Sequence, residues 1–351
     1  MTILDTLNIQ FILIIGILLG ALIIIFFLRK PKVHTEMQLL TKSSYNNSRL
    51  ESSLWFDDQI GEFKTIIKLG KSVDQQVAFE VIPDTGSHIL IVSGPECVKC
   101  PVEKGMWKDS LGTLTQLQGT ISYGGGQVTK YRVWKSNLVD YDNQPINFGV
   151  ITASMFKDSI DNSNNSNNSN NVQEMQNILG LQDGHITSTF LSQLKEPRNV
   201  VFDFPKSRFY IGQIDDILES RIVSSWNLIA PQRGLLYPLS FITEMNINGT
   251  EVPKDLMPTV AIWDTGTTRS MVDPDLYAYL SSLSSPNFKI SISFAKMFSD
   301  TLSNKTEFNS SLSIIGTEKL PFKRAILIGN QWVSQNGIGF MFSDSRIVIF
   351  K

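Results

Sequence analysis

Sulfur and imidazole side chains are scarce in this sequence. Its 351 residues include two cysteines and three histidines. Two cysteines cannot build the framework of a disulfide-rich secreted domain. Cys97 and Cys100 are separated by two residues, a spacing that leaves a local disulfide, a free pair or half of a metal site open. The histidines stand singly, so we expect neither a Ser/His or Cys/His nucleophile system nor a set of metal ligands.

Clusters of one charge sign are also missing beyond the N-terminal region. Lysine and arginine total 31, and aspartate and glutamate total 33, which gives a formal net charge of −2. This balance does not provide the basic surface that nucleic acids require, so no nucleic-acid partner is expected. The hydrophobic content of 42% and the aromatic content of 10% are typical of a globular chain with one sizeable core or two smaller ones.

One long apolar run is present, at residues 11–28, and it carries no charge. It is long enough to cross a lipid bilayer as a helix. A cleaved signal peptide is the alternative, but that needs positive charge before the run and small residues at its end, whereas Asp5 is the only charge there and bulky residues end the run. We therefore expect residues 1–30 to form a single-pass anchor. The positive charges after the run favour a cytosolic side for the rest of the chain; they are Arg29, Lys30 and Lys32.

The sequence after the anchor changes character once. Residues 31–57 mix Lys, Ser, Asn and Glu without an apolar period, which predicts a polar stalk. From there on, short β-branched and aromatic runs alternate with Gly, Asn, Asp and Pro turns, which predicts an all-β fold. Helices are expected only at 187–195 and 274–283. The Asn/Ser tract at 161–171 cannot bury apolar area and predicts a disordered surface insertion, and a second loop is expected at 299–313.

The most informative motif is an Asp-Thr-Gly triplet that occurs twice. It stands in VIPDTGSHILIV at residues 81–92 and in AIWDTGTTRSMV at residues 261–272. Two such triplets in one chain are rarely a coincidence. Each aspartate ends an apolar run that would be buried as a strand, where a lone ionised carboxylate is costly. Asp84 and Asp264 are therefore candidates to share one charge.

The two triplets belong to an internal duplication. Each is followed later by an apolar pair and a glycine, ILG at residues 178–180 and LIG at residues 327–329. Two carboxylates held close together share one proton and titrate as a pair. One can then take a proton from a water while the other gives a proton to a carbonyl oxygen, without a covalent intermediate. A glycosidase also needs two carboxylates, but it does not need matching Thr-Gly settings.

From Phe63 to Phe350 these motifs resemble the pepsin-like aspartic peptidase family. The segment FKTIIKLGKSVDQQVAFEVIPDTGS is similar to the first strand, glycine turn and first catalytic loop of the family. TISYGGGQV resembles its flap, and NILGL and ILIGNQ resemble the strands behind the two aspartates. The resemblance implies a bilobal all-β fold with lobes at residues 58–215 and 216–351. It also implies an aspartic endopeptidase that acts on polypeptides without a cofactor, as a monomer, because both aspartates lie on one chain.

The resemblance also implies roles for individual residues. Asp84 and Asp264 are the expected catalytic pair. The residues expected to support their carboxylates are Thr85, Gly86, Ser87, Thr265, Gly266 and Thr267. Flap and substrate contacts are expected at Tyr123, Gly124, Gly125 and Thr268. A hydroxyl residue directly after the second triplet accompanies acidic optima in the family, so an acidic optimum is expected here.

Three departures from the family pattern concern the surroundings of the pair. Ile91 stands where the family usually has a tryptophan that bonds the flap tyrosine, Gly126 adds a glycine to the flap tip, and Pro83 directly precedes the first aspartate. A proline removes a backbone donor from a strand that should be paired. These departures leave a second interpretation open, a membrane-tethered binding protein on the same fold whose catalysis has been lost.

Overall fold

The computed structural model describes residues 49–351 apart from gaps at 98–99, 101, 124–126, 157–174, 184–188, 230–236, 284–286, 297–300, 312–313 and 319. Residues 47–351 form one compact unit. The expected anchor at 1–30 and the expected insertion at 161–171 lie outside the described residues. Within the described ranges, no helix is long and apolar enough to cross a membrane.

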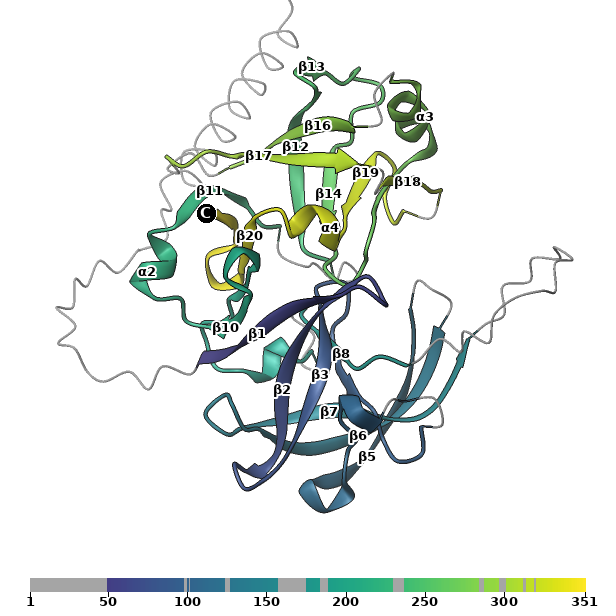
Figure 1. The fold of residues 1–351 in the computed structure, drawn as a ribbon, viewed down its shortest axis with the longest axis vertical. Helices are drawn as coiled ribbons and strands as arrows, with labels where there is room; N and C mark the ends of the chain where they lie inside the picture. The colour runs from purple at the N-terminus through teal and green to yellow at the C-terminus, as the bar shows by residue number, and fades with distance from the viewer. Residues whose placement is uncertain are drawn as a thin grey trace, which may run out of the picture. The chain divides into compact units, whose positions relative to one another are not determined.

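Strands dominate the described part of the chain, which confirms the all-β prediction (Figure 1). The strands of one sheet are β1 (Arg49–Asp57), β2 (Glu62–Ser72), β3 (Gln75–Asp84), β4 (Leu90–Val92), β5 (Thr113–Ser122), β6 (Gln127–Leu138), β7 (Gln144–Phe156), β8 (Ile178–Gly180), β9 (Val200–Asp203), β10 (Arg208–Gly212), β11 (Ile222–Asn227), β20 (Gly337–Met341) and β21 (Arg346–Phe350). Those of the other are β12 (Leu239–Ile247), β13 (Thr250–Glu251), β14 (Val260–Trp263), β15 (Ser270–Val272), β16 (Asn287–Phe294), β17 (Lys305–Ser311), β18 (Ile314–Gly316) and β19 (Ala325–Ile328). The helices are α2 (Asp216–Glu219), α3 (Pro274–Ser282) and α4 (Asn330–Val333), with 3-10 turns η1 (Val102–Lys104), η2 (Asp109–Leu111), η3 (Leu191–Gln193), η4 (Phe204–Lys206) and η5 (Phe342–Asp344).

The described strands form two sheets. The 13-stranded sheet has the order β11-β21-β20-β9-β10-β1-β2-β3-β8-β4-β7-β6-β5, and β2 also pairs with β6. The 8-stranded sheet has the order β17-β16-β12-β14-β19-β15-β18, with β13 paired to β12. Strands β9, β19 and β20 are buried along their whole length, and β14 is buried after its first residue. Such continuous apolar runs are typical of strands that are covered on both faces.

The internal duplication predicted from the sequence is visible in the strand pairing. Strand β3 runs into Asp84 and pairs in parallel with β8, where Asp84 lies opposite Gly180. Strand β14 runs up to Asp264 and pairs in parallel with β19, with Trp263 opposite Ile328. Strand β4 then pairs antiparallel with β8, as β15 does with β19. Each copy therefore brings its aspartate to the end of a buried strand that is backed by the ILG or LIG segment.

Pro83 fits into β3 without breaking its pairing. The antiparallel pairing of β3 with β2 ends before the proline. On the other side of β3, the flanking residues carry the parallel pairing. The N–H of Ile82 donates to the carbonyl of Asn177 at 2.9 Å, and the carbonyl of Asp84 accepts from the N–H of Leu181 at 2.8 Å. The donor that proline lacks is therefore not needed at this position.

Aromatic side chains pack directly before the second aspartate. Trp263, the residue before Asp264, stacks on Trp226 with ring centroids 5.7 Å apart. The indole N–H groups of both tryptophans donate to the hydroxyl of Ser240, at 3.2 and 3.1 Å. Phe294 stacks on Trp226 at 4.5 Å. Because the buried donors are satisfied, this cluster gives the strand before Asp264 a rigid support.

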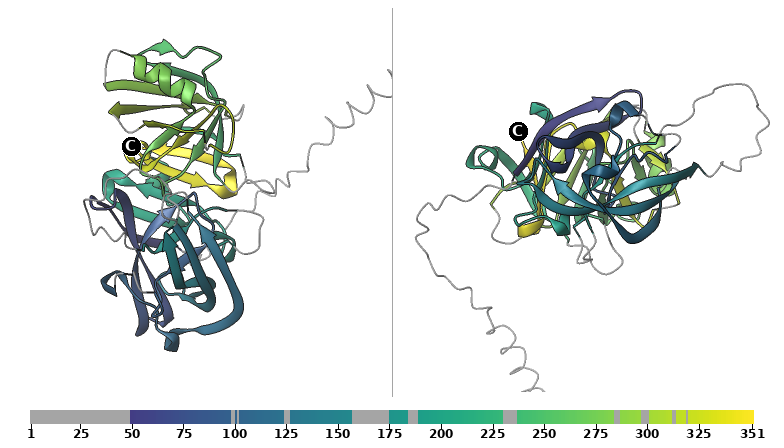
Figure 2. Two further views of the ribbon diagram at one scale, coloured as in Figure 1. Left: turned by 90° about the vertical axis from the view of Figure 1, so that its right-hand side faces the viewer. Right: turned by 90° about the horizontal axis from the view of Figure 1, so that it is seen from below.

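Strands from the last part of the sequence complete the 13-stranded sheet. Strand β20 pairs with β9, where Ile338 lies opposite Phe202, and β21 pairs with β11 and β20. In Figure 2 these yellow strands lie against the teal strands from the middle of the chain. Segments that are far apart in the sequence therefore share one sheet.

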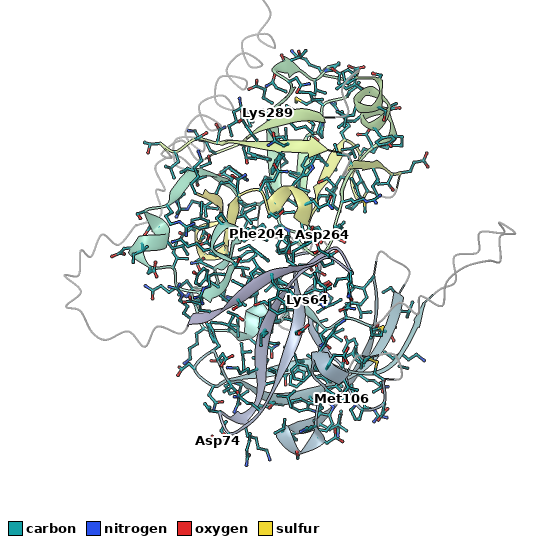
Figure 3. All side chains as sticks on the ribbon, viewed as in Figure 1. Lys64, Asp74, Met106, Phe204, Asp264 and Lys289 are labelled. Carbon is teal, nitrogen blue, oxygen red and sulfur yellow. A yellow bond between two sulfur atoms is a disulfide. The ribbon has the colours of Figure 1, made fainter. Side chains whose placement is uncertain are left out.

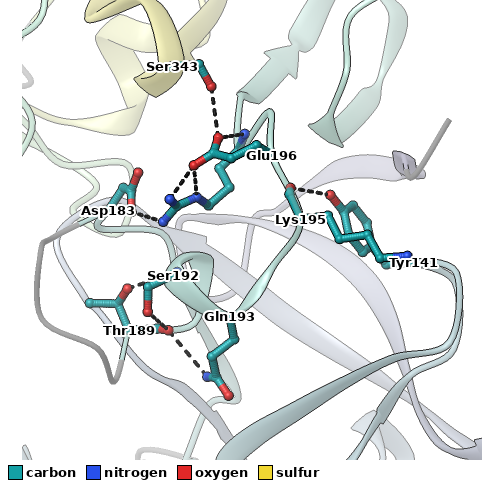
Figure 4. Close-up of polar contacts among 9 residues, drawn as sticks. Tyr141, Asp183, Thr189, Ser192, Gln193, Lys195, Glu196 and Ser343 are labelled. Carbon is teal, nitrogen blue, oxygen red and sulfur yellow. Dashed lines mark hydrogen bonds and ion pairs between the residues drawn. The ribbon is translucent and has the colours of Figure 1, made fainter. Parts of the chain in front are cut away.

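A polar network also ties the segment before β9 to the end of β20. Arg198 pairs with Asp183 at 2.9 Å, and its Nε donates to Glu196 at 2.6 Å (Figure 4). The other carboxylate oxygen of Glu196 accepts from the hydroxyl of Ser343 in η5 at 3.0 Å. This network adds a side-chain connection to the backbone pairing of β9 and β20.

The structure corrects two of the predictions made from the sequence. The last part of the expected stalk at 31–57 is strand β1, which pairs with β10 and β2 and buries Leu50 and Leu54. The loop expected at 299–313 contains strand β17, which pairs along its whole length with β16 and buries Phe308. Strand β17 carries a single apolar residue, and the apolar residues of β1 stand at the end of a long polar segment, so the average composition of each segment predicted no strand.

One of the two expected helices is confirmed. The helix predicted at 274–283 is α3, which begins after Asp273, whose side chain accepts from the N–H of Leu276 at 3.0 Å. An N-terminal aspartate followed by proline is a common helix start. In the described part of 187–195, the structure has only the short turn η3.

Candidate active site

The first Asp-Thr-Gly loop holds its carboxylate through two hydrogen bonds. Asp84 ends β3, and its side chain is 8% exposed. Its Oδ1 atom accepts from the N–H of Gly86 at 2.7 Å, and its Oδ2 atom accepts from the hydroxyl of Ser87. Hydrogen bonds of this kind favour the ionised form of a carboxyl group. Both residues therefore have the supporting role that was expected of them.

The second loop repeats this arrangement. The N–H of Gly266 donates to Oδ1 of Asp264 at 3.1 Å, and the hydroxyl of Thr267 donates to Oδ2 at 2.9 Å. Asp264 is partly buried and lies where the elements of the two sheets meet (Figure 3). The two loops are thus equivalent in sequence and in geometry.

The threonines of the two triplets connect the loops to each other. The N–H of Thr85 donates to the hydroxyl of Thr265, and the N–H of Thr265 donates to the hydroxyl of Thr85, both at 3.0 Å. Each hydroxyl also donates to the carbonyl of the residue before the opposite aspartate: that of Thr85 to Trp263 at 2.9 Å, and that of Thr265 to Pro83 at 2.8 Å. All of these groups are buried, so the bonds fix the two loops in one relative position.

The glycines of the triplets let the two carboxyl groups approach. A β-carbon on Gly86 would lie 2.6 Å from Oδ1 of Asp264, and one on Gly266 would lie 2.3 Å from Oδ1 of Asp84. Any side chain at either position would therefore collide with the carboxyl group of the other loop. The two carboxyl groups are therefore close enough for each to shift the pKa of the other.

Burial and mutual repulsion distribute the charge of the pair unequally. Burial raises the pKa of Asp84, while the hydrogen bonds from Ser87 and Gly86 oppose that rise. Burial raises the pKa of Asp264 well above its ordinary value, and the charge of Asp84 raises it further. Two carboxyl groups so close cannot both ionise cheaply. The pair therefore titrates as a unit that retains one proton after the first has been released.

The described part of the expected flap lies close to the pair. Tyr123 follows β5, and its hydroxyl is buried without a hydrogen-bond partner among the described residues. Its pKa is raised by burial and by the charge of Asp84. Gly124 and Gly125 lie outside the described residues. Tyr123 therefore lies close enough to the pair for the charge of Asp84 to act on it, and its role in a flap stays a prediction.

A second tyrosine fills the space beside Ile91, which stands where a tryptophan was expected from the resemblance. Tyr131 in β6 packs in one cluster with Ile91. A β-carbon on Gly119 would lie 2.3 Å from the hydroxyl of Tyr131, and one on Gly149 would lie 2.9 Å from its ring. The ring of Tyr131 therefore lies across both glycines, next to Ile91. These two glycines on the neighbouring strands make room for an aromatic ring from β6.

Two residues near the pair were not anticipated from the sequence. Tyr237 is half-buried, and burial together with the charges of both aspartates raises its pKa. Glu62 at the start of β2 accepts a hydrogen bond from the hydroxyl of Thr268 at 2.5 Å. Thr268, which was expected to contact substrate, thus has its hydroxyl occupied by Glu62. Neither Tyr237 nor Glu62 stands in a motif, so no sequence signal identified them.

The cysteines form a local disulfide, one of the three states left open by their spacing. Cys97 and Cys100 are joined with their Cα atoms 5.5 Å apart. Both are buried in the cluster that contains Ile91 and against which Tyr131 packs. Among the residues that the structure describes, no group of three or more His, Cys, Asp or Glu side chains is arranged to hold a metal ion.

Comparisons with known proteins add no homologue to this description. The sequence matches no protein-family model, and no curated protein is significantly similar to it. The functional argument therefore depends on the geometry of Asp84, Asp264 and the loops that hold them.

Proposed function

We propose that this protein is an aspartic endopeptidase that hydrolyses peptide bonds with a water activated between Asp84 and Asp264. The observation that carries the proposal is the pair itself, two neighbouring carboxyl groups with raised pKa values that are held by matching loops. The separation also matters. A retaining glycosidase keeps its carboxyl groups about 5 Å apart and an inverting one keeps them further apart, whereas here each carboxyl group lies directly against the Thr-Gly turn that holds the other.

The two acids have different tasks in the state in which Asp264 carries the shared proton. Asp84 then takes a proton from the water as the oxygen of that water bonds to the peptide carbon. Asp264 gives its proton to the carbonyl oxygen, which produces a neutral diol. The C–N bond then breaks while Asp84 returns its proton to the leaving nitrogen and Asp264 recovers one from a diol hydroxyl. Each carboxyl group ends in the state in which it began, and no covalent intermediate forms.

The fold proposed for this chemistry is the bilobal one of the pepsin-like peptidases, with lobes at 58–215 and 216–351. The repeated pairing of β3 with β8 and of β14 with β19 supports it. The proposed anchor at 11–28 would tether a monomeric enzyme to a bilayer, where its substrates are polypeptides. The positive charges after the anchor favour the cytosolic side, while the disulfide favours an oxidising compartment.

A binding protein that has lost catalysis is the second candidate. Ile91 favours it, because the hydroxyl of Tyr123 then lacks the partner that would fix the flap. The complete set of bonds in both Asp-Thr-Gly loops favours the enzyme, because binding alone does not require a shared proton.

Peptide cleavage distinguishes the two candidates. The full chain is incubated with a mixed peptide library between pH 3 and pH 8, with and without pepstatin. We expect pepstatin-sensitive cleavage that falls by about 10³-fold or more in Asp84→Asn and in Asp264→Asn. Asp74→Asn, at an exposed turn between β2 and β3, is the matched control. Wild-type-like cleavage in either mutant of the pair would rule out the mechanism, and pepstatin binding without cleavage would favour the binding protein.

A further inference from the structure

A third carboxyl group lies beside the pair and joins segments from distant parts of the chain. Glu62 begins β2, which pairs with β3, the strand that ends at Asp84. Its Oε1 atom accepts from the hydroxyl of Thr268 at 2.5 Å, and its Oε2 atom accepts from the side-chain amide of Asn330. Thr268 belongs to the loop of Asp264, and Asn330 begins α4. One side chain thus contacts two elements of the second half.

The backbone around Glu62 is shaped for this contact. Gly61 has a positive φ of 73°, a conformation that glycine adopts at little cost. A β-carbon at Gly61 would lie 3.2 Å from the methyl group of Thr268. The carbonyl of Gly61 also accepts from the side-chain amide of Asn330 at 3.4 Å. The turn before β2 therefore lies directly against the loop of Asp264.

Asn330 extends the connection to the backbone of the second loop. Asn330 is fully buried, and its backbone N–H donates to the backbone carbonyl of Thr267 at 2.8 Å. The hydroxyl of Thr267 in turn donates to Asp264. Three hydrogen bonds thus connect Glu62 with Asp264. They join Glu62 to the side chain of Asn330, the backbone of Asn330 to that of Thr267, and the hydroxyl of Thr267 to Asp264. Displacement of Glu62 would reach the carboxyl group of Asp264 through two residues.

We propose that Glu62 is a positioning residue of the catalytic pair, whose carboxyl group fastens the loop of Asp264 and helix α4 to strand β2. This inference rests on the proposed peptidase function for its catalytic consequence. Glu62 does not touch the reacting atoms. It acts by keeping the second loop at the distance from the first that lets the two carboxyl groups share a proton.

The charges around Glu62 indicate that it acts as a neutral acid. Burial and the charge of Asp84 raise the pKa of Glu62 to about 8. Asp57, opposite Glu62 on β1, is paired with Lys64, which also faces Glu80. Charged groups also stand at Asp58 in the turn before β2, at Asp264 and at the exposed Arg269 of the second loop, and further along the strands at Arg49 and Glu51 of β1 and at Lys68 and Lys71 of β2, whereas α4 carries none.

If Glu62 acts as a neutral acid, its glutamine and alanine variants should behave differently. Glutamine keeps the shape of the protonated carboxyl group and one acceptor for Thr268, whereas alanine removes both contacts. Below pH 7 we expect Glu62→Gln to keep kcat within about threefold of the wild type. We expect Glu62→Ala to lower kcat by about 10- to 100-fold with a smaller change in KM, because the loop of Asp264 is displaced. Glu219→Gln, on the exposed helix α2, is the matched control.

A spectroscopic measurement tests the contact without relying on activity. Carbon-13 NMR of the side-chain carboxyl groups in the full chain is recorded as the pH is raised. We expect a glutamate step near pH 8 that disappears in Glu62→Gln, and shifted Asp264 signals in Glu62→Ala but not in Glu62→Gln. If the step is lost in Glu62→Gln but neither the wild type nor any variant cleaves peptides, the contact of Glu62 is supported and the proposed peptidase function is rejected. Wild-type kcat and an unshifted Asp264 signal in Glu62→Ala would overturn the positioning role.

Discussion

Replacement of Glu62 by glutamine should change how the stability of the protein depends on pH. The folded state raises the pKa of Glu62 from 4.5 to about 8. Between these values the unfolded chain releases this proton while the folded protein retains it. Stability linked to Glu62 is therefore complete below about pH 4.5 and is lost progressively as the pH rises to 8.

The size of the effect follows from the same two values. At about 1.4 kcal/mol for each pH unit, the loss amounts to at most about 5 kcal/mol, since the part of the side chain that water reaches screens its charge. This is comparable with the whole stability of many proteins, which is about 5–15 kcal/mol. The raised pKa values of Asp84 and Asp264 act in the same direction, so the wild-type protein should lose stability on moving from acid to neutral pH.

Denaturant unfolding at a series of pH values measures this effect. The free energy of unfolding is determined in urea between pH 4.5 and pH 8.5 for the wild type, Glu62→Gln and the control Glu219→Gln. We expect the free energy of unfolding of the wild type and of the control to fall in parallel as the pH rises. The free energy of unfolding of Glu62→Gln should fall by up to about 5 kcal/mol less over the same range. Parallel curves for all three proteins would refute the reasoning, because they would mean that Glu62 keeps its ordinary pKa.

Three further predictions concern the pair, its loops and the membrane. Thr267→Ala removes the donor to Asp264, so its pKa should rise further and the alkaline limb of an acidic pH–rate profile should move up by about one unit; an unmoved limb would exclude this role. Thr85→Val leaves the N–H of Thr265 buried and unpaired, so urea unfolding should show a loss of about 2–4 kcal/mol, whereas an unchanged midpoint would contradict the importance of the cross-loop bonds. In sealed microsomes, added protease should digest a tag after residue 351, as the charges after the apolar run predict; a protected tag would place the folded unit in the lumen, where the disulfide forms readily.

The repeated triplet allowed the pair and its supporting residues to be predicted because their contacts are local or symmetric. Ser87 lies three residues after Asp84, and the threonines meet because the two copies face each other. The all-β fold could be predicted for a similar reason, since alternation and turn residues are local signals. Strand β1 was not predicted because its first half has one apolar residue, Leu50, among polar ones, and it follows directly on a polar segment.

Glu62 and Tyr131 could not be found in this way. The sequence around Glu62 is polar and typical of an exposed turn, and its burial arises from Thr268 and Asn330, which lie 206 and 268 residues further along the chain. The ring of Tyr131 depends on glycines in two other strands for its space. Such fits between distant residues leave no trace in the periodicity of either segment.

The pairing of β20 with β9 and of β21 with β11 has a consequence for the order of folding. The 13-stranded sheet is incomplete until β20 and β21 have been synthesised. These two strands must then pair with strands that precede them by more than a hundred residues. Until then, the edges of β9 and β11 are unpaired and open to other strands. A growing chain therefore passes through a stage in which most of its residues exist but its sheet is incomplete, and this stage is the one at which aggregation competes with folding.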